Sequence, residues 1–257
     1  MDASNTEKGI SELEGIDQDT YSLEQHIARP QITQISCLLG VLLVMVLLVS
    51  NFAAIKLVEI NVFNFGSITF PMGLLFFPLT YILSDIFTEV YGYKTARFMI
   101  WVGFSANIFF CLACWLTMLF PAYPLWFYSY EFNTTISFMP RIFLFSAISY
   151  FFGEFINAIT LSRLKVIFKG RKMGLRFVIS TFLGVLADSI MVGVGIWYGK
   201  LPFQSLLQLI FWLTFFKVAY EFISLPITYR IVHKLKRIEN LDVVDHNERY
   251  NIFSIKL

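Results

Sequence analysis

The stretch ISCLLGVLLVMVLLVSNFAAI, residues 35–55, contains no charged residue. A helix of about 20 apolar residues is long enough to cross the hydrocarbon layer of a bilayer, which is roughly 30 Å thick. Five further stretches have the same character, so we expect an all-α polytopic membrane protein with about six transmembrane helices. The predicted spans are residues 35–55, 71–91, 98–120, 141–161, 177–198 and 205–231.

The composition of the whole chain agrees with this prediction. Of its 257 residues, 57% are apolar and only 15% are charged, and the mean hydropathy is +0.66. A soluble domain carries about 25% charged residues. The net charge is +2, and no Lys- and Arg-rich stripe with interleaved aromatic residues is visible, so nucleic acid is not expected as a partner. The expected surroundings are a lipid bilayer.

The segments outside the predicted spans set the orientation. Residues 1–34 hold seven acidic residues and lack a basic region before a short apolar core, so they are predicted to be an acidic cytoplasmic tail and not a signal peptide. The six-helix domain then covers residues 35–231, and residues 232–257 form a cytoplasmic C-terminal tail. One side of the membrane would carry fifteen of the 20 Lys and Arg residues, and the other only Lys56 and Lys200. The positive-inside rule therefore predicts that both termini are cytoplasmic.

Two connecting segments and one cysteine pair need separate interpretation. Residues 57–70 are apolar but too short for a crossing, so we expect a re-entrant or interfacial piece. Residues 121–140 are rich in Tyr and Trp, which is typical of a loop at the membrane interface. Cys111 and Cys114 lie inside an apolar span without a second pair of ligands, so we interpret them as packing residues. No metal and no cofactor are expected.

The functional prediction rests on acidic residues inside the spans, where a charge costs at least about 2.5–3.5 kcal/mol. These residues are Asp85, Glu89, Glu154, Asp188 and Glu221. Lys217 is the only base well inside a span, and it lies one helical turn from Glu221, so the two can pair. One such pair leaves a surplus of carboxylates, which need protons, a solvated cavity or a ligand. The alternative is that they are structural contacts between helices.

The residue types suggest which ligand a pocket here would take. Carboxylates accept parallel N–H bonds, and aromatic faces suit flat rings or cations. A flat, nitrogen-rich, neutral or cationic solute therefore fits better than an anion. An enzyme is not expected, because all three histidines lie outside the spans and no H-E-x-x-H, intramembrane serine triad or Walker A motif is present.

One long motif carries a resemblance to a known family. The run FPLTYILSDIFTEVYGYKTAR, residues 77–97, closely resembles the signature of the bacterial queuosine-precursor transporters, also called the vitamin uptake transporter family. Shorter pieces extend the resemblance over about residues 35–235. They include Ser50-Asn51, Pro140-Arg141-Ile142, Gly153-Glu154 with Asn157, Asp188-Ser189, and Lys217 with Glu221. The chain departs from many relatives at Val185, where they have an acidic or amide residue.

The resemblance implies import of queuosine precursors across the cell inner membrane for salvage into tRNA, without an obligate protein partner. These precursors are 7-deazaguanines with a nitrile or aminomethyl group, or the free base queuine. It also implies a fold similar to the substrate-binding component of energy-coupling-factor vitamin transporters. The matching positions predict substrate-binding residues at Asn51, Asp85, Glu89, Arg97, Arg141, Glu154, Asn157, Asp188, Lys217 and Glu221. Arg97 and Arg141 lie at span ends, so we expect them at the cytoplasmic and outer mouths respectively.

The alternative function is a substrate-capture subunit of an ATP-driven vitamin transporter. Such subunits generally present a seam of small residues on the first span to the coupling protein. Here that span reads LLGVLLVM over residues 38–45, without an Ala-x-x-x-Ala pattern. The absence of this seam favours a transporter that works without a coupling protein.

Overall fold

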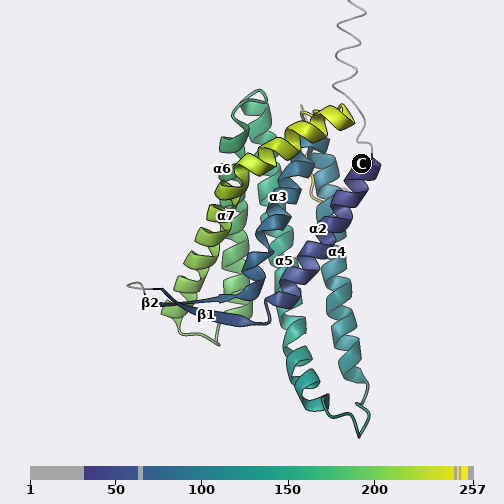
Figure 1. Ribbon diagram of the computed structural model, residues 1–257, viewed down its shortest axis with the longest axis vertical. Helices are drawn as coiled ribbons and strands as arrows, with labels where there is room; N and C mark the ends of the chain where they lie inside the picture. The colour runs from purple at the N-terminus through teal and green to yellow at the C-terminus, as the bar shows by residue number, and fades with distance from the viewer. Residues whose placement is uncertain (1–31, 63–65, 246–247, 249, 254–257) are drawn as a thin grey trace, which may run out of the picture.

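The structure is a computed structural model that describes residues 32–62, 66–245, 248 and 250–253. The acidic tail predicted for residues 1–34 lies outside the described residues, except for its last three positions. Long helices stand side by side in a bundle, and a two-stranded sheet lies at one end of it (Figure 1). We call that end the hairpin end, and the opposite end, where α7 terminates, the network end.

The helices follow one another along the chain, and the longest connection, between α2 and α3, contains the two strands. Their bounds are α2 Gln34–Ala53, α3 Pro78–Ile86, α4 Gly92–Leu119, α5 Ser129–Ile167, α6 Met173–Val192 and α7 Phe203–Glu239. A 3-10 helix, η1 (Met72–Leu75), precedes α3, and two π-helical turns, η2 (Phe87–Tyr91) and η3 (Gly193–Trp197), extend α3 and α6. Such turns often occur at functional sites.

Within the described residues, five helical stretches are long and apolar enough to cross a membrane. They are Gln34–Ala53, Met72–Leu119, Ser129–Ile167, Met173–Trp197 and Phe203–Glu239. The prediction of a helical polytopic membrane protein is therefore confirmed.

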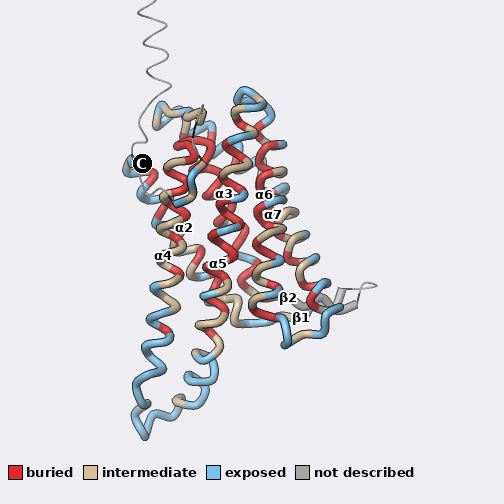
Figure 2. The backbone as a smooth tube through the Cα atoms, turned by 180° about the vertical axis from the view of Figure 1, so that it is seen from behind, coloured by how far each residue is buried: buried red, intermediate tan, exposed pale blue. Residues whose placement is uncertain are grey.

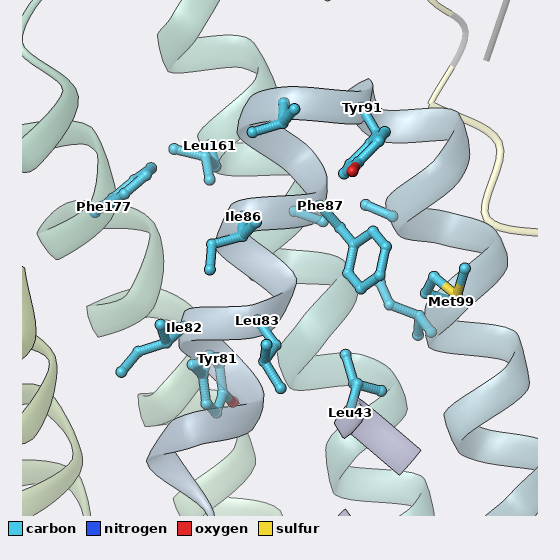
Figure 3. Close-up of a cluster of buried hydrophobic side chains, with 14 of the residues drawn as sticks. Leu43, Tyr81, Ile82, Leu83, Ile86, Phe87, Tyr91, Met99, Leu161 and Phe177 are labelled. Carbon is cyan, nitrogen blue, oxygen red and sulfur yellow. The ribbon is translucent and has the colours of Figure 1, made fainter. Parts of the chain in front are cut away.

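The second of these stretches is not one straight helix. Gly92 has a φ of +82°, a conformation that glycine adopts without steric cost, and the chain turns back there (Figure 3). Phe87 and Met99 consequently lie against the same residue, Gly40 of α2. Twelve residues of continuous helix would hold them about 18 Å apart. The predicted spans 71–91 and 98–120 correspond to the two arms of this stretch.

The segment between α2 and α3 forms an antiparallel hairpin, which the sequence analysis did not predict. Strand β1 (Leu57–Val62) pairs with β2 (Gly66–Pro71), with Leu57 opposite Pro71. β-branched residues at every second position of β1 favour a strand. The hairpin lies at the end of the bundle (Figure 1), where strand edges need not be buried in hydrocarbon.

Two helices extend beyond their predicted ends. Helix α5 begins at Ser129 and contains Pro140, so about half of the predicted loop 121–140 is helical. Helix α7 continues to Glu239, past the predicted end at residue 231. Proline is tolerated in membrane helices because neighbouring groups satisfy the freed backbone. The ends of α4 and α5 project beyond the hairpin end and are largely exposed (Figure 2).

Helix α3 occupies the centre of the bundle. All residues from Thr80 to Tyr91 are buried, and their side chains lie among Leu43 of α2, Leu161 of α5 and Phe177 of α6 (Figure 3). Polar side chains on this segment therefore face other helices on every side. Asp85 and Glu89 both belong to it.

Helices α5 and α6 approach closely at two glycines. A Cβ atom added to Gly184 would lie 2.7 Å from the Gly153 carbonyl oxygen, and one added to Gly153 would lie 2.7 Å from the Tyr81 hydroxyl. Small residues let helix backbones come together in membranes. This contact brings Asn157 and Asp188 toward α3.

Candidate functional site

Four acidic residues from four helices meet inside the bundle. We call Asp85 of α3, Glu154 of α5, Asp188 of α6 and Glu221 of α7 the interior acid cluster. Each is at most 1% exposed, and they lie close enough for their charges to interact. The structure thus brings together four of the five acids that the sequence places within spans.

Asp85 is held by hydrogen bonds from two neighbouring helices. The Asn157 side-chain amide donates to its Oδ1 at 2.7 Å, and the Thr181 hydroxyl donates to its Oδ2 at 3.5 Å. These donors stabilise the ionised carboxylate. The close contact of Gly153 with Gly184 allows both donors to reach α3.

Lys217 forms an ion pair with Asp188, and its ammonium also lies 4.2 Å from the centre of the Phe77 ring. The pairing of Lys217 with Glu221 that the helical spacing allows is therefore not the one that forms. A partner on the neighbouring helix α6 replaces the partner one turn along α7.

Several polar atoms of this region have no hydrogen-bond partner among the described residues. They are both carboxylate oxygens of Glu154 and of Glu221, Asp188 Oδ1, Asn157 Oδ1, and the hydroxyls of Tyr81, Tyr150 and Ser189. Ser84 lies beside Glu154 without completing a hydrogen bond. Because buried polar groups are nearly always paired, this concentration of free acceptors marks a candidate binding site.

A cavity of about 50 Å³ leads from the hairpin end toward the interior acid cluster. Its lining runs from Ala54 and Pro71, beside the hairpin, to Phe77 and Lys217. Asn51 also lines it, and is fixed by donating to Asn107 at 2.6 Å and accepting from Ser146. Sites for small molecules usually measure about 300–1,000 Å³, so the cavity must widen to admit a solute.

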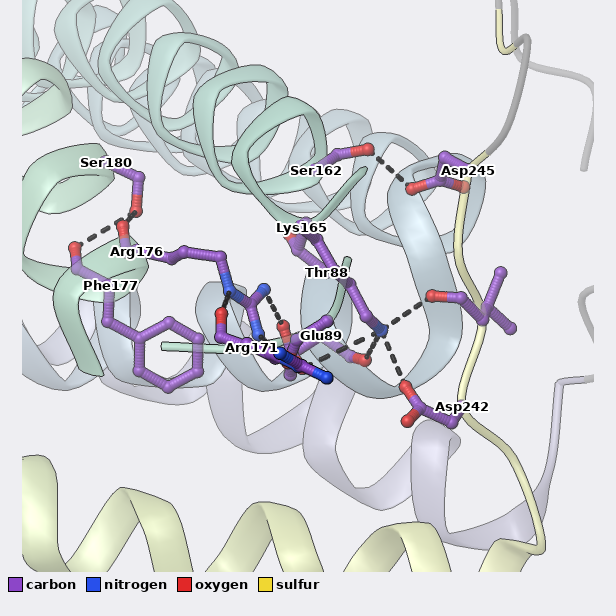
Figure 4. Close-up of polar contacts among 12 residues, drawn as sticks. Thr88, Glu89, Ser162, Lys165, Arg171, Arg176, Phe177, Ser180, Asp242 and Asp245 are labelled. Carbon is purple, nitrogen blue, oxygen red and sulfur yellow. Dashed lines mark hydrogen bonds and ion pairs between the residues drawn. The ribbon is translucent and has the colours of Figure 1, made fainter. Parts of the chain in front are cut away.

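Glu89 lies four residues after Asp85, at the network end, and its charge also acts on Asp85, but its own partners are cations (Figure 4). Arg176 binds its carboxylate with two hydrogen bonds, of 2.7 and 3.2 Å, and Lys236 binds it at 2.8 Å. Lys165 lies 3.7 Å from the carboxylate and donates to the Glu89 carbonyl oxygen at 2.6 Å. Together with Asp242, these residues form what we call the Glu89 network.

The segment after α7, residues 240–253 as far as they are described, folds back over the network end. Lys165 and Lys236 bind the Asp242 carboxylate at 2.7 and 2.8 Å. Burial opposes ionisation of Asp242, but these two ammonium groups outweigh it and lower the pKa of the carboxyl. Asp245 accepts from the backbone N–H of Tyr93 and from Ser162. The segment therefore ties α3, α4, α5 and α7 together.

The two predicted arginines lie at opposite ends of the bundle. Arg97 donates to the Asn251 carbonyl oxygen at 3.1 Å, at the network end. Arg141 donates to the Gly195 carbonyl oxygen at 3.1 and 3.2 Å, where η3 ends. Both of these contacts involve backbone carbonyls of other segments, outside the interior acid cluster.

Sequence reasoning missed the partners of Glu89. Lys165 and Arg176 lie between the predicted spans 141–161 and 177–198, among the fifteen basic residues counted on the cytoplasmic side, yet both are at most 1% exposed. A buried charge needs a partner. Glu89 lies at the end of the predicted span 71–91 on the same side of the membrane, so the sequence could have suggested it as the acid that pairs with these bases. Tyr81 and Tyr150, whose hydroxyls face the interior, carried no signal, because tyrosine is common in apolar spans.

A helical bundle with several membrane-length apolar helices and ionisable residues buried between them is typical of membrane transport proteins. Residues 71–231 match the family described as "Putative vitamin uptake transporter", and the chain belongs to this family. A "Probable queuosine precursor transporter" from Bacillus subtilis (strain 168) is 26% identical over 181 residues, which cover 70% of this chain and 77% of the relative. No solved structure matches significantly. The family agrees with the resemblance found in residues 77–97.

Proposed function

We propose that this transporter imports queuosine precursors for salvage into tRNA. The observation that supports this proposal is a cavity lined by Lys217, which pairs with Asp188, near the unpaired carboxylates of Glu154 and Glu221. Such a site accepts hydrogen bonds from a nitrogen-rich solute. The name of the Bacillus subtilis relative favours the same class of solute.

The chemistry of a 7-deazaguanine suits the residues around the cavity. Its N1–H and 2-amino group present two parallel donors, which one carboxylate can accept together. Asp188 binds Lys217, which lines the cavity, and has one unpaired oxygen. Asn51 offers an amide on the cavity wall, and the Phe77 ring offers a face for stacking. We assign the first contacts of the solute to these three residues and Lys217.

The other predicted residues take part later or at the ends of the pathway. We assign Asp85, Glu154, Asn157 and Glu221 to contacts that form as the helices separate and the solute moves inward. We assign Glu89, Arg97 and Arg141 to closing the two ends, because their partners lie there.

The proposed topology has six crossings, with the two arms of Met72–Leu119 counted separately because of the reversal at Gly92. The network end then faces the cytoplasm, together with both termini, and the hairpin end faces outward. This assignment places most Lys and Arg residues inside. The proposed location is the inner membrane of a bacterial cell.

The alternative is a substrate-capture subunit with the fold of energy-coupling-factor components, which would need an ATPase module. The lipid-facing side of α2 favours a transporter without such a partner, since its exposed residues are large. They include Leu38, Val41, Leu42, Met45 and Val49. Uptake in cells that lack every coupling module would decide between the two functions.

The direct test is the queuosine content of tRNA in a bacterial host that lacks both queuosine synthesis and its own precursor importer. The chain is expressed there, and the nitrile precursor, the aminomethyl precursor or queuine is supplied separately, with the salvage enzyme for queuine. Restored modification identifies the solute. Absence of modification with all three, despite insertion of the protein in the membrane, contradicts the proposal.

A further inference from the structure

Glu154 and Glu221 lack the partners that buried carboxylates normally have. Neither accepts a hydrogen bond within the described part of the chain, and none of the ion pairs found there includes either residue. Both are at most 1% exposed. They differ in this respect from Asp85, Glu89 and Asp188, each of which has a donor or a cation.

The groups that face Glu154 and Glu221 cannot balance two negative charges. The titratable side chains around them are Tyr81 and Asp85 of α3, Tyr150 of α5, Asp188 of α6 and Lys217 of α7. Helix α2 has no acidic or basic residue, and the bases of α4, Lys94 and Arg97, contact the C-terminal segment. Among the described residues that surround the two glutamates, Lys217 is thus the single base, and Asp188 already binds it.

An ionised carboxylate without a partner is very costly in apolar surroundings, and such a group keeps a proton instead. Asp85 differs from them in its contacts, because Asn157 and Thr181 donate hydrogen bonds to it. Neither Glu154 nor Glu221 accepts such a bond among the described residues; Ser84, beside Glu154, does not complete one. The favourable state for both residues in this conformation is the neutral, protonated one.

We propose that Glu154 and Glu221 form a proton-binding site and that the protons they hold are co-transported with the solute. Proton binding itself follows from the surroundings of the two residues, whereas the coupling rests on the proposed function.

Lys217 is the link between the cavity and this site. It lines the cavity, and its charge also acts on Glu154. A solute that donates hydrogen bonds to Asp188 competes with Lys217 for that carboxylate. The freed ammonium then stabilises ionised Glu154, whose proton leaves as H⁺ on the cytoplasmic side as the helices open inward with the solute bound. After the solute has also left inward, Lys217 returns to Asp188, and Glu154 binds a new proton from outside when the cavity is open there. One proton then enters with each solute, so the inward proton gradient of a bacterium would drive accumulation.

Infrared spectroscopy of the purified protein in lipid vesicles tests proton binding without any transport. Protonated carboxyl groups absorb at a higher C=O stretching frequency than carboxylates. At neutral pH we expect such bands in the unmodified protein and their partial loss in Glu154→Gln and in Glu221→Gln. Glu59→Gln, on the exposed face of β1, is the matched control and should leave the bands unchanged. Unchanged bands in both glutamate variants would overturn the proposal.

Transport by the same vesicles tests the coupling. With the nitrile precursor outside, uptake should acidify the interior, and an imposed inward proton gradient should raise accumulation. Glu154→Gln imitates the protonated state permanently, so gradient-driven accumulation should be lost while exchange of internal for external solute continues. Glu154→Asp should restore part of the gradient-driven accumulation.

The outcomes separate the two proposals. Uptake that ignores the gradient and moves no protons would overturn proton coupling but leave the importer function intact. Absence of any uptake, with loss of the infrared bands in the variants, would contradict the importer function but support the proton-binding site.

Discussion

Two glutamates of this bundle are equally buried and have opposite surroundings. Glu89 is bound by Arg176 and Lys236, with Lys165 nearby (Figure 4), whereas Glu154 has no hydrogen-bond partner. Glu89 belongs to a region where each charged side chain has a partner of opposite charge, and these ion pairs hold helices together. Glu154 belongs to a region with unpaired hydrogen-bond acceptors, which are able to bind a proton or a solute. Burial alone therefore does not distinguish a structural carboxylate from a functional one; the partners do.

The largest expected effect is the loss of the anion at the network end. In Glu89→Ala, the cations of Lys165 and Arg176 stay buried without their main counter-charge, which costs about 3–5 kcal/mol for a broken buried ion pair. We expect a much lower thermal transition of the detergent-solubilised protein, measured by fluorescence-detected size-exclusion chromatography. Glu59→Ala, at an exposed site, should not change the transition. An unchanged transition in Glu89→Ala would contradict a stabilising role.

The second prediction removes charges from the interior instead. We expect Asp85→Asn and Asp188→Asn each to reduce uptake to background, because each alters an acceptor of the interior acid cluster, and Glu154→Gln to abolish net uptake while exchange of internal for external solute continues. Glu154→Gln should not lower the thermal transition, since no cation loses a partner. The measurements are uptake per amount of protein in the membrane and the transition temperature. Normal uptake in all three variants would exclude the cluster as the binding site.

The third prediction concerns the segment after α7, which folds back over the network end. Ser162 is 1% exposed and donates to Asp245, so a cysteine there should react slowly with a maleimide. Deleting residues 240–257 should make Ser162→Cys reactive, with a smaller loss of stability than Glu89→Ala causes, because Glu89 keeps Arg176. The reaction is measured in a chain whose three native cysteines are replaced. Equal reactivity with and without the segment would show that it does not cover this end.

The smallest expected effect is a dependence on pH at the same end. Asp242 has a lowered pKa, so its ion pairs are intact above the ordinary Asp pKa and are lost as the pH falls through the lowered value. We expect faster exchange of the Val243 amide, which donates to the Val90 carbonyl oxygen, below that pH, after correction for the intrinsic exchange rate. The effect is small because the Asp242 side chain is 57% exposed. Asp242→Asn should abolish the pH dependence.

Much of the fold could be predicted from local sequence. Each apolar run longer than a bilayer crossing had one stable conformation available, a helix, because hydrocarbon leaves backbone groups no other partners. The hairpin of residues 57–71 was missed because its segment is short, and strand alternation over six residues is a weak signal. The extra turns of α5 and α7 were missed because their ends lie outside the hydrocarbon, where hydropathy no longer marks a helix.

The candidate site, like the fold, could be predicted from the sequence only in part. The sequence identified the acidic residues inside the spans, since a charge in an apolar run is visible by itself. It could not say which acids share a site, because that depends on helix order and rotation in the bundle. Spacing along α7 offered Glu221 to Lys217, yet Asp188 on the neighbouring helix binds it.

The sequence by itself determined that this protein lies in a membrane as a helical bundle, which residues carry charge inside it, and to which family it is similar. Only the tertiary structure decided that Glu89 is neutralised by cations from three other parts of the chain and that Glu154 and Glu221 are not. The physical reason is the separation along the chain between the residues that determine each property. Hydropathy and helix formation depend on residues a few positions apart, whereas the pairing of a buried charge depends on side chains that approach within about 4 Å from distant segments.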